Sequence, residues 1–138
     1  MVKTINMQDM RYLNLFSKIT RVSTRFCFKY NEAIVFCVPM KFVSQAVGEG
    51  ARNIKEMSNI LRKRIKVIPA PRGIQDAKKF IEAIVSPVKF NDLEITDDEI
   101  ILTAGSHNKA ALIGRNKRRM IEMQGIVKDF FGKEFRIV

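Results

Sequence analysis

The sequence predicts an α+β fold made of two copies of one unit. The first observation is the order of the expected elements: helix, strand, strand, helix, glycine turn, helix, strand, given twice within 138 residues. The second is that a shift of 66 residues places one run on the other, as an internal repeat requires. We therefore expect two domains, at 1–70 and 71–138, each with a three-stranded sheet.

The spacing of apolar residues and the turn residues predict the elements of the first half. Apolar residues recur every three positions over 8–20, which predicts an amphipathic helix with Asp9 able to cap its start. Two aromatic, β-rich runs over 25–39 predict a hairpin. Residues 40–63 predict a short helix, a glycine turn and a longer helix, and residues 64–70 predict a strand that ends at prolines.

The second half repeats these patterns in the same order. Its first segment, 73–86, predicts an amphipathic helix with an apolar face made of Ala77, Phe80, Ile81 and Ile84. The later segments predict a hairpin over 88–105 that turns at Asp97-Asp98, a short helix over 106–114, a longer helix over 115–131 and a last strand over 134–138.

Individual residues also match between the two halves. At the shift of 66, Gly48 aligns with Gly114 and Arg52 aligns with Arg118. The last strands align only at a shift of 70, which implies four extra residues near Gly132. The two glycine turns are therefore expected to be copies of one structure.

The charge of the chain favours a polyanionic partner. The net charge is +11 and the pI is about 10.0. Residues 41–66 have seven basic and two acidic side chains, and residues 105–138 have eight and three, which gives +5 for each. The segment between them, 67–104, has four and seven, or −3. Because the positive charge is concentrated in the segments with the glycine turns, we expect nucleic acid first and an acidic membrane surface second.

No set of residues in the sequence suits catalysis or metal binding. Two cysteines and the single His107, 70 residues beyond Cys37, do not make a zinc site. Asp97, Asp98 and Glu99 are typical of a turn between strands rather than of a metal site. No nucleophile–base set or paired carboxylates can be assembled. We therefore expect no enzyme activity, no catalytic residue, no metal and no cofactor.

The cysteines and the hydropathy indicate a cytoplasmic protein. A two-residue turn at 31–32 makes facing residues sum to 63, so that Cys27 faces Phe36 and Cys37 faces Phe26. The thiols then point to opposite faces of the sheet and stay unbridged. No stretch approaches the roughly 18 consecutive apolar residues of a membrane span, and the N-terminus has no apolar signal core. We expect a monomer without a membrane partner.

The two glycine turns suit the binding of phosphate. They lie in "QAVGEGARNI" and "ALIGRNKRRM", where an apolar pair precedes a glycine and a helical run follows. A helix N-terminus has free N–H groups and a partial positive charge, and glycine before it lets a phosphate come close. The basic residues around the second turn add Coulomb attraction.

A strand, helix, glycine loop, helix and strand, with a helix and a strand before them, resembles the type II KH domain. Two such units joined by "PAPRG" resemble the archaeal NusA-like transcription factors. The polymerase-binding N-terminal domain and the S1 domain of bacterial NusA have no counterpart here. The resemblance implies a factor that binds single-stranded RNA and acts in transcription elongation, termination or antitermination. It also implies the RNA polymerase elongation complex as a partner.

The resemblance also implies which residues meet RNA. KH loops hold the RNA backbone while bases lie in an adjacent groove, here expected between 41–47 and 65–69 and between 110–113 and 135–138. Both loops keep the family's first glycine and lose the second, to Ala51 and to Lys117. The residues expected to bind RNA are Gly48, Glu49, Gly50, Ala51, Arg52 and Lys55 in the first unit, and Gly114, Arg115, Asn116, Lys117, Arg118 and Arg119 in the second.

Two alternatives remain open. The stretch "VGEGAR" also resembles the helix-hairpin-helix turn, which grips duplex DNA without sequence preference and needs no strand after its second helix. A protein adaptor that uses its basic face on an acidic partner is the other alternative. Binding to single-stranded RNA, to duplex DNA and to isolated polymerase would separate the three.

Overall fold

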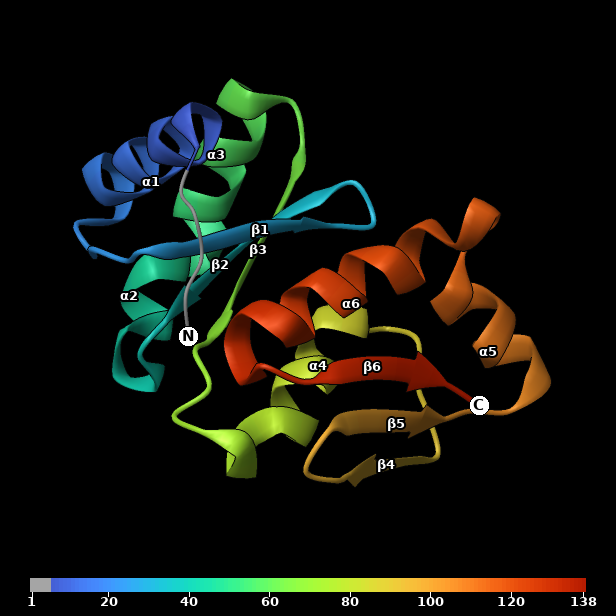
Figure 1. Ribbon diagram of the computed structural model, residues 1–138. Coiled ribbons are helices and arrows are strands. Elements are labelled where there is room, and N and C mark those ends of the chain that lie inside the picture. The colour runs from blue at the N-terminus through green and yellow to red at the C-terminus, as the bar shows by residue number, and fades with distance from the viewer. Residues whose placement is uncertain (1–5) are drawn as a thin grey trace. The chain divides into compact units, whose positions relative to one another are not determined.

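The computed structural model describes residues 6–138, which form an α+β fold with two compact units. The first unit ends at Ala70 and the second begins at Pro71, and residues 1–5 of the expected first domain lie outside the described residues. Each unit has the order helix, strand, strand, helix, helix, strand that the resemblance to type II KH domains implies. In Figure 1 the first unit runs from blue to green and the second from yellow-green to red.

The first unit contains three α-helices and one sheet. Its elements are α1 (Met7–Thr20), β1 (Phe26–Tyr30), β2 (Ala33–Val38), α2 (Val43–Val47), α3 (Arg52–Leu61) and β3 (Arg64–Pro69), with 3-10 turns η1 (Met40–Phe42) and η2 (Glu49–Ala51). Asn6 caps α1, because its side-chain oxygen accepts from the amide of Asp9 at 2.8 Å. The expectation that Asp9 caps this helix was therefore wrong: Asp9 lies inside the first turn, and its amide is the one being capped.

The sheet of the first unit has the order β1-β2-β3, antiparallel and then parallel. Its hairpin confirms the predicted register, since Cys27 pairs with Phe36 and Cys37 pairs with Phe26. Asn31 and Glu32 form the two-residue turn with φ of 51° and 64°, the left-handed angles that such hairpin turns need. Both cysteines are buried, unbridged thiols, as the register predicts.

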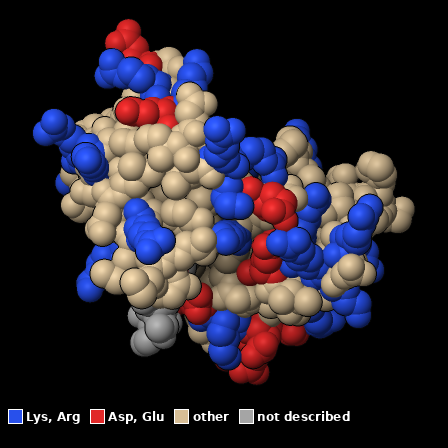
Figure 2. Space-filling view, turned by 90° about the horizontal axis from the view of Figure 1, so that it is seen from above, with Lys and Arg blue, Asp and Glu red and all other residues tan. Residues whose placement is uncertain are grey.

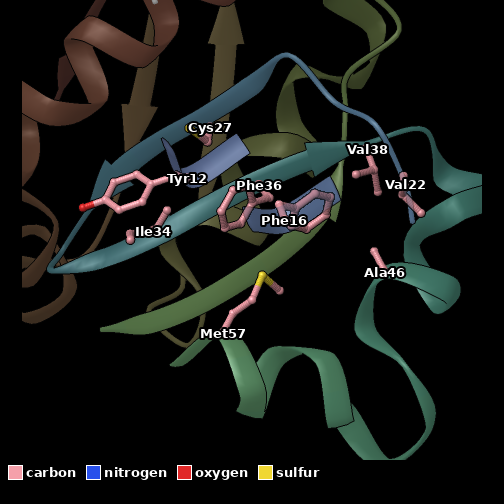
Figure 3. Packing of buried hydrophobic residues seen from close by; sticks show 9 residues of the cluster. All are labelled: Tyr12, Phe16, Val22, Cys27, Ile34, Phe36, Val38, Ala46 and Met57. Carbon is pink, nitrogen blue, oxygen red and sulfur yellow. The ribbon is translucent and has the colours of Figure 1, made fainter. Parts of the chain in front are cut away.

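One face of this sheet is covered by the helices of its own unit (Figure 3). Phe16 of α1 stacks on Phe36 of β2, with ring centroids 4.4 Å apart and planes at 17°. Ala46 of α2 and Met57 of α3 complete the buried cluster, and neither is exposed. Truncating a buried phenylalanine to alanine costs about 3–5 kcal/mol, so this cluster is a main source of the unit's stability.

The second unit repeats this arrangement. Its elements are α4 (Ala77–Val85) after the 3-10 turn η3 (Ile74–Asp76), β4 (Asp92–Ile95), β5 (Glu99–Thr103), α5 (Ser106–Ile113), the 3-10 turn η4 (Arg115–Lys117), α6 (Arg118–Phe131) and β6 (Glu134–Ile137). The sheet order is β4-β5-β6. The predicted apolar face of α4 is confirmed: all four residues are buried, and the Phe80 ring lies 4.8 Å from that of Phe130.

The strand register confirms the internal repeat. Ile34 pairs with Ile65 in the first unit, and Ile100 pairs with Phe135 in the second, which reproduces the shifts of 66 and 70. The four extra residues lie inside a helix, since α3 has 10 residues and α6 has 14. Both helices then end at a left-handed residue, Arg62 or Gly132. Four residues are about one helical turn, so the insertion lengthens α6 without rotating its apolar face far.

Candidate nucleic-acid interface

The two glycine loops have the same backbone conformation. The first glycine has φ 80° and ψ 163° at Gly48, and φ 77° and ψ 172° at Gly114. The third residue is left-handed in both loops, with φ 61° at Gly50 and φ 56° at Asn116. Because two stretches of different sequence adopt one conformation, the loops are copies of one structure and not incidental turns.

The fourth loop position is left-handed although glycine is absent from it. Ala51 has φ 61° and ψ 28°, and Lys117 has φ 59° and ψ 20°. Non-glycine residues in this region cost on the order of 1–3 kcal/mol, and the surrounding structure must hold them there. Both units therefore keep a left-handed backbone at this position without a glycine.

The first loop glycine is required by contact as well as by φ. A Cβ at Gly48 would lie 3.0 Å from the side chain of Asn53, and a Cβ at Gly114 would lie 2.9 Å from Cγ of Arg119. Contacts of that length force neighbouring atoms to move. Both glycines therefore let the loop pass close to the first turn of the next helix.

A side chain of that first turn ties the loop together in each unit. Asn53 donates from Nδ2 to the carbonyl oxygen of Gln45 at 3.2 Å, near the end of α2. Arg119 donates from Nη1 to the carbonyl oxygen of Ala111 at 2.9 Å, near the end of α5. At the shift of 66, Asn53 corresponds to Arg119 and Gln45 corresponds to Ala111. The two units therefore make the same hydrogen bond with different side chains. Arg119, which the resemblance places on RNA, is half-buried and has this structural contact.

No side chain caps the helix N-termini that follow the loops. Neither Ala51 nor Lys117 caps the following helix with its side chain, and the first turns of α3 and α6 contain no acidic residue. Orphan N–H groups and the positive end of the helix dipole remain at such a terminus. Each loop thus passes close to the positive end of a helix dipole that no side chain caps.

The loops differ in charge. In the first, Glu49 is exposed, and Arg52 and Lys55 lie further along α3. In the second, Arg115 and Lys117 are both exposed within the loop itself. In Figure 2 blue Lys and Arg side chains are scattered among tan residues over the visible face, and red acidic side chains lie in several groups. The second loop is therefore the more positively charged of the two.

Sequence comparison finds similar archaeal proteins. No family model matches the chain. It is 26% identical over 128 residues to the probable transcription termination protein NusA of Methanococcus vannielii, covering 88% of this chain and 72% of that protein. A protein of the same name from Methanocaldococcus jannaschii is 27% identical over 86 residues, or 62% of this chain and 45% of that protein. The chain is a distant homologue of these archaeal NusA proteins.

A solved structure shares the fold. The crystal structure of APE1850 matches with a TM-score of 0.68 at 23% identity, over 97% of this chain and 99% of that chain. The match extends over both units, so the duplicated arrangement is itself shared. At this identity the likeness shows the fold alone.

In each unit the short helix before the loop contacts the last strand. Within the first unit α2 contacts β3, and within the second α5 contacts β6. Val43 of α2 is partly buried and packs on the core with Ile65 and Val67 of β3. In this distant NusA homologue, strands β3 and β6 follow the second helices, which favours KH-like units over helix-hairpin-helix turns.

The other polar residues considered in the sequence lie outside the loops. The pKa of Glu99 is lowered because its carboxylate accepts hydrogen bonds from Arg136 at 3.1 Å, and because the guanidinium is positively charged. Asp97 and Asp98 form the β4–β5 turn, and His107 is exposed at the start of α5. Over residues 6–138 no three His, Cys, Asp or Glu side chains gather as metal ligands. In that same range no helix has the length and apolar character to cross a bilayer.

Proposed function

We propose that this chain is a single-stranded RNA-binding factor that acts in transcription elongation or termination. The observation that supports it best is the pair of loops with one backbone conformation, each before a helix N-terminus that no side chain caps, in a homologue of the archaeal termination proteins. Under this proposal, 1–70 and 71–138 are two KH domains and the activity is binding, without catalysis.

Each loop would hold one stretch of RNA backbone. The glycine at 48 or 114 lets the phosphate approach the N–H groups of the following helix without a Cβ in the way. Side chains around the loop add charge, which favours the second loop, where Arg115 and Lys117 are exposed. Bases would lie between α2 and β3 or between α5 and β6 and be recognised at their edges.

The partner beyond RNA would be the polymerase elongation complex. A factor that holds nascent RNA with two loops can change how the transcript leaves the enzyme, and so favour pausing, termination or antitermination. The positive charge that serves RNA in this proposal, +11 in total, would also steer the chain to the transcript.

The experiment is a titration of the whole chain with single-stranded RNA, with duplex DNA and with isolated polymerase. We expect the tightest binding to single-stranded RNA, with log K falling by roughly 0.7 per phosphate contact for each tenfold increase in salt. Tighter binding to duplex DNA would favour the helix-hairpin-helix alternative. Binding to polymerase with none to either nucleic acid would favour a protein adaptor.

A further inference from the structure

The first unit has a concentration of positive charge at the end of α3 away from its loop. Arg62, Lys63 and Arg64 connect α3 to β3. In Figure 1 the chain leaves the loop, rises through α3 and turns back into β3 beyond the far end of that helix. Because α3 has 10 residues, this cluster lies about 15 Å from the loop, at 1.5 Å per residue.

None of the three cations is neutralised by a carboxylate among the described residues. Arg62 and Arg64 are exposed, and Lys63 is half-buried. Arg64 donates from Nη2 to the carbonyl oxygen of Asn31, a neutral acceptor in the hairpin turn. That contact holds one guanidinium nitrogen against the turn without neutralising the positive charge of the side chain.

The same place in the second unit is neutral and internally paired. At the shift of 70 the corresponding residues are Gly132, Lys133 and Glu134. Lys133 donates to the carbonyl oxygens of Thr96 and Asp97 at 2.6 and 2.8 Å. Glu134 accepts from Lys128 at 3.2 Å. Three charges of one sign in the first unit thus stand where the second unit has one lysine and one glutamate.

The loops show the reverse difference. Loop 48–51 has a charge of −1, from Glu49, and loop 114–117 has a charge of +2, from Arg115 and Lys117. The first unit is therefore negative at its loop and positive at the far end of α3. A helix C-terminus favours a nearby cation by about 0.3–1 kcal/mol, but this does not account for three adjacent cations that repel one another.

We infer that Arg62, Lys63 and Arg64 form a second phosphate-binding surface, which supplies more backbone attraction to the first unit than loop 48–51 does. The inference rests on the proposed function, because RNA is the polyanion that the chain would already hold. Two of the three side chains are arginines, whose guanidinium matches phosphate with two parallel hydrogen bonds. RNA that leaves the loop would then continue along α3.

The test replaces the three residues by Arg62→Gln, Lys63→Gln and Arg64→Gln in the whole chain. The ligand is a single-stranded RNA of about twelve nucleotides, three times what one KH loop clamps. Three lost phosphate contacts lower the salt slope by about 2, which corresponds to as much as 100-fold weaker binding at 0.1 M salt. The control variant is Lys78→Gln, Lys79→Gln and Lys89→Gln, which removes three exposed charges from the acidic segment and should stay within about twofold.

A second variant separates charge from folding, because Arg64 also contacts the hairpin turn. Arg62→Lys with Arg64→Lys keeps all three charges and should keep the wild-type salt slope. If the glutamine variant binds the RNA with the wild-type slope, the inference is wrong and the proposed function stands. If the glutamine variant keeps its RNA affinity but no longer binds an acidic protein partner, the inference is also wrong. If the wild-type chain binds no single-stranded RNA, the proposed function itself fails.

Discussion

The loops at 48–51 and 114–117 have one backbone and opposite charges. At the first, third and fourth loop positions the corresponding angles differ by no more than 9°, as ψ of the first glycine shows at 163° and 172°. Yet the second residue is Glu49 in one and Arg115 in the other. Backbone shape in this protein therefore depends on contacts within each unit, while the exposed loop side chains are free to differ.

The contacts that fix the shape lie in the first turn of the following helix. Asn53 and Arg119 differ in size and charge, yet each donates to a backbone carbonyl at the equivalent position of the preceding helix. Each also lies against the position where a Cβ on the loop glycine would be. In each unit, the first loop glycine and this hydrogen bond together bring the two helices close. The left-handed loop residues fit between those helices.

The largest effect is expected from reversing the charge of the second loop. Arg115→Asp with Lys117→Asp puts two negative charges where phosphates should bind, at a cost of about 2–4 kcal/mol for exposed charge-assisted contacts. At 1.4 kcal/mol per factor of ten, RNA should bind at least about 30-fold more weakly. The measurement is an RNA titration at one salt concentration, with Lys78→Asp and Lys79→Asp as the matched control. Binding within twofold of wild type would mean that this loop is only a turn.

Adding a methyl group to the first loop glycine should cost about 2–3 kcal/mol of unfolding free energy. Gly114 occupies a φ/ψ region that essentially only glycine adopts, and a Cβ there would lie 2.9 Å from Cγ of Arg119. Gly125→Ala is the control, since that residue lies in α6 with open space around it, and it should stabilise by about 0.5–1 kcal/mol. Chemical denaturation measures the unfolding free energy of both variants. If both substitutions change it in the same direction, the loop geometry is contradicted.

The hydrogen bonds of Asn53 and Arg119 should contribute less to stability than the loop glycines do. They should contribute nothing to the salt dependence of RNA binding. Arg119→Ala and Asn53→Ala each remove one hydrogen bond to a helix-end carbonyl, worth about 1 kcal/mol of unfolding free energy. Because Arg119 is tied, its loss should leave the salt slope of RNA binding unchanged, whereas Arg115→Ala should reduce it by about 0.7. An equal drop in slope for both arginines would show that Arg119 contacts phosphate directly.

Changing the charge of the first loop should strengthen binding. Glu49→Lys removes one repulsion and adds one attraction at an exposed site, which is worth up to about 1 kcal/mol, or about fivefold in affinity. Glu56→Lys makes the same change of charge at an exposed position further along α3 and should have less effect. If both variants improve binding equally, net charge and not the loop accounts for the gain.

The sequence was sufficient for the fold because its patterns are local. Apolar spacing predicted the buried face of α4, and the pair Asn31-Glu32 predicted the hairpin register and hence the separated cysteines. Where two neighbouring residues compete for one local role, the pattern does not decide. The cap of α1 is such a case, because both Asn6 and Asp9 have the right chemistry.

The loop conformation required tertiary structure. Alanine and lysine have no preference for left-handed angles, so nothing at Ala51 or Lys117 signals their backbone. Asn53 was missed because a tie to Gln45 depends on how two helices meet. Its alignment with Arg119 at the shift of 66 was the available signal, but the two side chains have no chemistry in common beyond a donor N–H.

The smallest expected effect tests the left-handed position itself. Ala51→Gly relieves the steric cost of φ 61°, about 1–2 kcal/mol for an L residue, but it raises the entropy of the unfolded chain by about 0.4–1 kcal/mol. Relief exceeds the entropic loss, so the unfolding free energy should rise by about 0.5 kcal/mol. Ala110→Gly is the control, because Ala110 is exposed in the middle of α5, where glycine should destabilise by about 1 kcal/mol. Denaturant titrations show whether each variant raises or lowers the unfolding free energy. If Ala51→Gly destabilises as much as Ala110→Gly, residue 51 is not left-handed in solution, and the equality of the two loop backbones fails at its fourth position.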